Sequence, residues 1–190
     1  MGKAVLISIQ PKWCELVAVR KKSVEVRKNR PKLETPFRCY IYQTRKKWLY
    51  KLFAALKHFA WAKTIVSGKG KVIGEFVCDK IFDICIMMTN PEDFPDVPFP
   101  LTGLTDKEII QYLGNGVAGY GWHISDLKIY DKPKRLSEFY FPPETFCEKE
   151  LCGGCPKEQS ISEYGDVMFD CEWKRPVMKA PQSWCYVEEL

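Results

Sequence analysis

Apolar residues alternate with polar ones, or form short apolar runs, in about six segments of the chain, which is the pattern of β-strands. The first segment, residues 4–9, is a continuous apolar run. In the next segment Val24 and Val26 face one way, and Glu25 and Arg27 share the opposite, polar face. The other strand-like segments are residues 37–44, 71–78, 119–131 and 183–190.

Helix signals separate these strands. Pro11 suits the first turn of a helix, where its missing N–H would have no partner. Residues 45–66 form a basic amphipathic pattern, typical of a helix that packs on its own domain or lies on a membrane or nucleic acid. Thr105 and Glu108 form a capping box that opens a helix ending before Gly114. We therefore expect an α+β protein, a small β-barrel of about six strands with flanking helices.

Charge is divided unevenly along the chain. Residues 1–71 contain 18 Lys and Arg against three acids, whereas the remainder contains 11 against 21. This division predicts a basic surface that meets a polyanion, although a fold that interleaves the two parts would cancel the field.

Hydropathy indicates no membrane partner. The sequence contains no run that approaches the ~18 uncharged apolar residues of a membrane span. The first apolar stretch is also too short for a signal peptide, so we expect a cytoplasmic protein.

The candidate binding residues gather between residues 10 and 32. An aromatic, Trp13, offers a stacking face, and Glu25 can accept hydrogen bonds from base N–H groups. The alternative places Trp13 in the core and makes Glu25 part of a surface ion pair. The cations that would hold phosphates are Lys12, Lys21, Lys22, Arg27, Lys28 and Arg30.

The segment LISIQPKWCELVAVRKKSVEVRKNRP resembles the opening of the ASCH domain (activating signal cointegrator homology), a family of the PUA-like superfamily. The family pattern Lys-x-x-Glu-x-Arg is matched by Lys22, Glu25 and Arg27. The segments GKVIGEFVCDKI and YGWHISDLKIYDKPKRLSEF are also similar to its later strands. The resemblance implies a PUA-like barrel over residues 1–141, completed by a last strand within 176–190, with residues 142–175 as a Cys-rich insertion.

The resemblance also implies a cleft beside the first helix that binds RNA, other nucleic acid or a modified nucleobase. An alternative is an enzyme on nucleobases or RNA, an amidohydrolase or ribonuclease, with Lys22 and Glu25 as catalytic residues. The amidohydrolase type has a threonine where this chain has Glu25, so the lysine of that pair is retained and the threonine is not. A second alternative is a module that binds an acidic protein.

Residues 119–123 form a second candidate group. Two glycines flank Tyr120 and precede Trp122 and His123, and they would let a base or backbone approach closely. Trp122 would then be a second wall of the cleft, and His123 a hydrogen-bonding group. Alternatively, Trp122 lies in the core and His123 faces outward.

Nine cysteines without a signal peptide indicate free thiols and a possible metal site. Cys152 and Cys155 have the spacing of a metal knuckle, and Cys171 is the best third ligand. The fourth ligand is Cys147 or Cys185, of which we favour Cys147. Four thiolates would hold a structural zinc ion that stabilises the short Cys-rich segment; unligated thiols or a redox pair are the alternative.

The zinc hypothesis predicts about one equivalent of zinc in protein purified without chelator. Cys152→Ser should lower the zinc content, measured by elemental analysis. Less than about half an equivalent in the unmodified protein would contradict the hypothesis.

Overall fold

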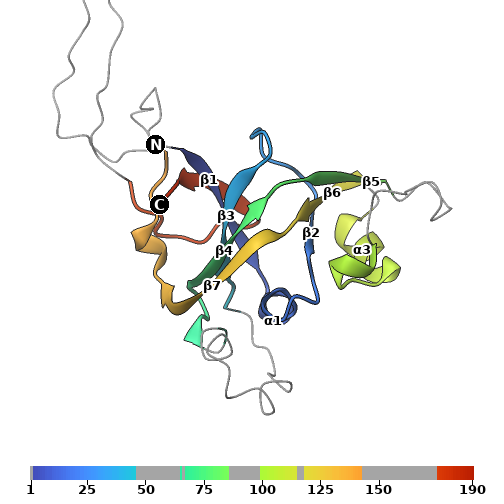
Figure 1. The fold of residues 1–190 in the computed structure, drawn as a ribbon, viewed down its shortest axis with the longest axis horizontal. Helices are drawn as coiled ribbons and strands as arrows, with labels where there is room; N and C mark the ends of the chain where they lie inside the picture. The colour runs from blue at the N-terminus through green and yellow to red at the C-terminus, as the bar shows by residue number, and fades with distance from the viewer. Residues whose placement is uncertain (1, 46–64, 66, 86–98, 115–117, 143–174) are drawn as a thin grey trace, which may run out of the picture.

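The computed structural model describes residues 2–45, 65, 67–85, 99–114, 118–142 and 175–190 (Figure 1). The predicted helix at 45–66 and the predicted insertion at 142–175 therefore lie almost entirely outside the described residues.

Five strands form the larger sheet, in the order β7-β4-β3-β1-β8. Its centre is the parallel pair β1 (Lys3–Ile9) and β3 (Phe37–Gln43), in which Ile9 lies opposite Gln43. The other neighbouring strands are antiparallel: β4 (Val72–Cys78) pairs with β3 and with β7 (Ser125–Lys134), and β8 (Trp184–Glu188) pairs with β1. The ends of the described chain therefore meet in this sheet.

Three strands form the smaller sheet, in the order β2-β6-β5. They are β2 (Val24–Arg27), β5 (Ile81–Cys85) and β6 (Ala118–His123), and β6 is antiparallel to both neighbours. Because β7 follows β6 after a single residue, Ile124, the chain passes from one sheet into the other at this point (Figure 1).

Local sequence signals explain where the helices begin. Helix α1 (Pro11–Ala18) starts at a proline, as expected, and α3 (Asp106–Leu113) begins with the predicted capping box of Thr105 and Glu108. Gly114 ends α3 at a positive φ of 72°, a conformation that favours glycine. Two 3-10 turns, η3 (Phe99–Thr102) and η4 (Leu136–Glu138), complete the described elements.

The main core lies between the two sheets. Trp122 of β6 is fully buried and meets Phe37 edge-on, with ring centroids 5.8 Å apart, and Trp184 at 6.0 Å. Its Nε1 has no hydrogen-bond partner among the described residues. Trp122 therefore contributes to the core through the packing of its ring and not through a hydrogen bond of its indole N–H.

The predicted α+β class is confirmed, but the strand arrangement differs from the prediction. The described strands are eight in two sheets, rather than about six in one closed barrel. The difference arises because residues 119–131 divide into two strands at Ile124, and because Ile81–Cys85 pairs as a separate strand. No helix in the described part of the chain is both long enough and apolar enough to cross a membrane.

Replacing Trp122 tests this core. Trp122→Ala should lower the free energy of unfolding by about 3–5 kcal/mol, because it leaves a large cavity. Trp122→Phe should cost clearly less, because it keeps an aromatic ring and loses no hydrogen bond. Urea denaturation of both variants checks this; equal losses would contradict the view that packing dominates.

Candidate nucleic-acid interface

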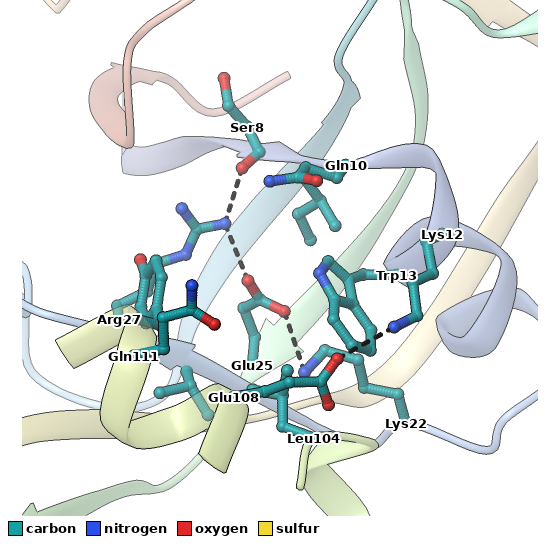
Figure 2. Close-up of a pocket in the computed structure, with 13 residues that line it drawn as sticks. Ser8, Gln10, Lys12, Trp13, Lys22, Glu25, Arg27, Leu104, Glu108 and Gln111 are labelled. Atoms are coloured by element: carbon teal, nitrogen blue, oxygen red, sulfur yellow. Dashed lines mark hydrogen bonds and ion pairs between the residues drawn. The ribbon is translucent and has the colours of Figure 1, made fainter. Parts of the chain in front are cut away.

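A pocket of about 360 Å³ opens where the end of β1 meets α1, β2 and α3. We call it the α1–α3 pocket. Figure 2 shows its polar side chains turned toward one another from these separate elements. Its lining residues are Ser8, Ile9, Gln10, Lys12, Trp13, Lys22, Glu25, Val26, Arg27, Leu104, Glu108, Gln111 and Tyr112.

A buried ion network forms the floor of the pocket. The Glu25 carboxylate lies between two cations, with Oε1 2.8 Å from Arg27 Nη2 and Oε2 3.3 Å from Lys22 Nζ (Figure 2). Lys22 is only 2% exposed, and Glu25 and Arg27 are each 6% exposed. Charges at this depth need partners, because an unpaired buried ion is strongly destabilising.

The same cations also hold the backbone. Lys22 Nζ donates to the carbonyl oxygens of Val24 at 2.8 Å and Thr102 at 2.6 Å. Together with the Glu25 carboxylate, these oxygens surround the ammonium group. Arg27 Nη2 also donates to the Ser8 carbonyl oxygen at 2.7 Å. The network therefore joins β2 to η3 and to the end of β1.

The C-terminal segment supports the floor from the other side. Arg27 Nη1 lies 3.4 Å from both the carbonyl oxygen and Oγ of Ser183. Ser8 Oγ donates to the carbonyl oxygen of Pro181 at 2.6 Å, and its N–H donates to that of Ser183. The residues that precede β8 thus fix the guanidinium from behind.

Burial determines the electrostatics of the floor. It lowers the pKa of the Lys22 ammonium, while Glu25 acts in the opposite direction by stabilising the charge. Two polar atoms of the floor are buried without a geometrically well-formed hydrogen bond to the described residues: Arg27 Nε, and Glu25 Oε2, which lies 3.3 Å from Lys22 Nζ. The floor therefore holds a buried acceptor and a buried donor that are incompletely satisfied by the described residues.

Trp13 forms the aromatic wall of the pocket. Its ring lies under Lys12, whose Nζ is 4.2 Å from the ring centroid, and Lys22 Nζ is 5.5 Å away. Lys12 also pairs with Glu108 at 3.1 Å, which connects α1 to α3 across the pocket (Figure 2). Hydrogen bonding by Thr105 and then by Lys12 lowers the pKa of the Glu108 carboxyl. Both partners are well exposed, so this pair can open at little cost.

Five of the predicted site residues meet in this pocket: Lys12, Trp13, Lys22, Glu25 and Arg27. Gln10, at the start of the predicted segment, also lines the pocket, whereas the lining residues Ser8, Glu108, Gln111 and Tyr112 were not expected from the sequence. For these four, the sequence signal was the capping box alone, which marked Glu108 for a different role. The other predicted cations, Lys21, Lys28 and Arg30, are exposed, and Lys28 lies 5.9 Å from the ring of the lining residue Tyr112.

The second predicted group lies elsewhere. Trp122, expected as a wall of the cleft, is part of the core between the sheets, because its strand position faces Phe37 and Trp184. His123 Nδ1 pairs with Asp79 Oδ1 at 2.6 Å, away from the pocket lining. Tyr120 packs against Arg30, with 5.7 Å from the guanidinium to the ring centroid. None of these three residues lines the α1–α3 pocket.

The predicted zinc ligands Cys147, Cys152, Cys155 and Cys171 lie outside the described residues. The alternative fourth ligand, Cys185, lies in β8 opposite Leu6, and burial raises the pKa of its thiol to about 11. No group of metal-binding side chains occurs among the residues that the structure describes. Zinc binding stays a prediction.

Comparison with solved structures identifies the fold. The chain is similar to the crystal structure of ASCH from Zymomonas mobilis, with a TM-score of 0.56 and 15% identity, over 98% of this chain and 88% of that one. It is also similar to two single-substitution variants of that protein. One replaces a tyrosine with phenylalanine (TM-score 0.54, 14% identity, 98% and 91% coverage), and the other replaces a serine with alanine (0.55, 15%, 98% and 89%). No family model and no curated protein matches the sequence. The chain therefore has the fold of an ASCH domain, as its opening segment predicted.

Separate and joint removal of Lys22 and Glu25 tests the buried network. Lys22→Met and Glu25→Gln should each lower the free energy of unfolding by about 3–5 kcal/mol, because each leaves a partner charge buried without its counterion. The double variant should lose less than the sum, with a coupling above about 1 kcal/mol.

The exposed pair Lys12–Glu108 provides the matched control for this cycle. Lys12→Met and Glu108→Gln should couple by less than about 1 kcal/mol in the same urea denaturation experiment. Equal coupling in both pairs would contradict the special role of the buried network.

Proposed function

We propose that this ASCH-fold protein binds single-stranded nucleic acid, with RNA or a modified nucleobase as the ligand, in the α1–α3 pocket. The observation that carries the proposal is the Glu25 carboxylate, fixed between two buried cations beside the Trp13 ring. The pocket volume of about 360 Å³ falls within the usual range for small-ligand sites.

The proposal assigns recognition of a base to Glu25 and Trp13. Base edges display N–H donors that a carboxylate can accept, and base faces stack on aromatic rings. Glu25 Oε2 and Arg27 Nε are both buried, and they would become an acceptor and a donor for such an edge when the side chains that cover them move on binding. A buried polar atom without a partner costs about 1–3 kcal/mol, so a ligand that satisfies it gains affinity.

The cations then divide into two roles. Lys22 and Arg27 are buried and already bonded to Glu25 and to backbone oxygens, so we assign them to positioning Glu25. The exposed residues Lys21, Lys28 and Arg30 have the free charge that phosphate groups require, and Lys12 can contribute after its pair with Glu108 opens.

Catalysis on a nucleobase or on RNA is the second candidate. The lowered pKa of Lys22 favours it, because acid–base chemistry uses groups tuned in this way. The three oxygen neighbours of Lys22 Nζ oppose it, because they occupy the directions from which a reacting atom would approach the ammonium. Product release that Lys22→Ala abolishes, in a variant that still folds, would favour the enzyme over the binding module.

Fluorescence anisotropy with labelled single-stranded RNA across a salt series tests the proposal. Binding should weaken steeply as salt rises, because phosphate contacts release counterions. Glu25→Gln should lower the affinity by about 1–3 kcal/mol, since it replaces the carboxylate acceptor. This variant and the unmodified protein should bind an RNA strand without bases with the same affinity.

Glu34→Gln is the control, because Glu34 is exposed and does not line the pocket. It makes the same change of charge and should leave the affinity unchanged. No binding at low salt would overturn the proposal, and equal effects of the two variants would overturn the role of Glu25.

A further inference from the structure

A second hollow, of about 330 Å³, is lined by four cations and no acid. We call it the basic hollow and define it by Arg45, Lys69, Lys71 and Arg135. Gly70, Leu136, Ser137, Val177 and Met178 complete its lining. It lies where β3 ends, β4 begins and β7 gives way to η4, and it shares no lining residue with the α1–α3 pocket.

Backbone hydrogen bonds hold the segments of Arg45, Lys69 and Lys71 close together. Gly70 N–H donates to the Gln43 carbonyl oxygen, and Gln43 N–H donates to that of Lys71, both at 2.9 Å. Gly70 has φ 76°, and a Cβ there would lie 2.7 Å from Arg45 Nε. The glycine therefore allows the Arg45 side chain to cross the turn between the two lysines.

The four charges have no carboxylate partner in the described part of the chain: none of its ion pairs involves them. The acid nearest to Arg135 in sequence, Glu138, accepts a hydrogen bond from the backbone N–H of Arg135 at 2.6 Å. Like charges that converge in a concave site repel one another and raise the local concentration of anions. This arrangement suits a phosphate group, which takes several such donors at once.

The two sites lie at neighbouring strand ends. Strands β1 and β3 are parallel, Ile9 lies opposite Gln43, and Thr44 N–H donates to the Ile9 carbonyl oxygen at 2.9 Å. Gln10 of the α1–α3 pocket follows Ile9, and Arg45 of the basic hollow follows Thr44. Because β1 and β3 are adjacent strands, the two sites lie at the same end of the larger sheet. Ile9 faces the core between the sheets and Val177 packs in the core on the opposite face, so a nucleic-acid strand that occupies both sites passes around this end of the sheet.

We infer that the basic hollow binds backbone phosphates of the same single strand whose base enters the α1–α3 pocket. This inference rests on the proposed function and extends it, because it makes the ligand a polynucleotide rather than a free nucleoside. In this arrangement the base in the α1–α3 pocket provides selectivity, and the phosphates in the basic hollow provide affinity.

The test uses the full chain and two labelled RNA probes of about ten nucleotides, within the usual size of single-strand sites. One probe carries bases and the other is abasic. The triple variant Lys69→Gln/Lys71→Gln/Arg135→Gln should bind both probes about tenfold more weakly at low salt. Its salt slope should fall by about 2, at roughly 0.7 for each of three phosphate contacts.

The control removes three exposed lysines outside both sites, in Lys3→Gln/Lys32→Gln/Lys128→Gln. Both triple variants lose the same net charge, and thermal unfolding verifies that each retains its fold. A loss confined to the basic-hollow variant supports the inference. Equal losses in the two variants, or unmodified protein that does not bind the abasic probe, overturn it.

The outcomes separate this inference from the proposed function. In one outcome, the basic-hollow variant binds the abasic probe more weakly than the unmodified protein does, and Glu25→Gln leaves the affinity for the base-bearing probe unchanged. This result supports the phosphate site and contradicts base recognition by Glu25. In the other outcome, Glu25→Gln lowers the affinity for the base-bearing probe, and the basic-hollow variant binds both probes as tightly as the unmodified protein does. This result supports the proposed function and contradicts the phosphate site.

Discussion

The buried carboxylate of Glu25 is the constraint on which the rest of this site depends. An ion at this depth is tolerated only with excellent partners, and Arg27 at 2.8 Å and Lys22 at 3.3 Å supply them. These cations have further donors, which the backbone oxygens of Val24, Thr102 and Ser8 accept. One carboxylate therefore fixes β2, η3 and the end of β1 relative to one another.

This arrangement explains how a pocket with so much buried charge is tolerated by the fold. The ion pairs hold the Glu25 and Arg27 side chains in one arrangement, which would lower the entropic cost of binding a planar ligand there. The wall is less constrained, because the exposed Lys12–Glu108 pair joins α1 and α3 only weakly. The basic hollow at the neighbouring strand end would add affinity without altering the floor.

Local sequence signals predicted the local features correctly. The alternation around Glu25 placed it on the same face as Arg27, with which it pairs, although this face is buried. The capping box located the start of α3. The resemblance of the opening segment to the ASCH domain predicted the fold. Features that depend on long-range contacts could not be read in this way. Glu25 is opposite Trp122 in the β2–β6 register, yet only packing against Phe37 and Trp184 determines that Trp122 belongs to the core.

The NMR signal of the Arg27 side-chain Nε–H tests the central claim most directly, because this group is buried in the floor and has no partner among the described residues. Titration with a short single-stranded RNA should shift this signal and the indole N–H signal of Trp13 along the same binding curve. The signal of Trp122, in the core, should stay in place. RNA binding that leaves the Arg27 and Trp13 signals unchanged would contradict the account.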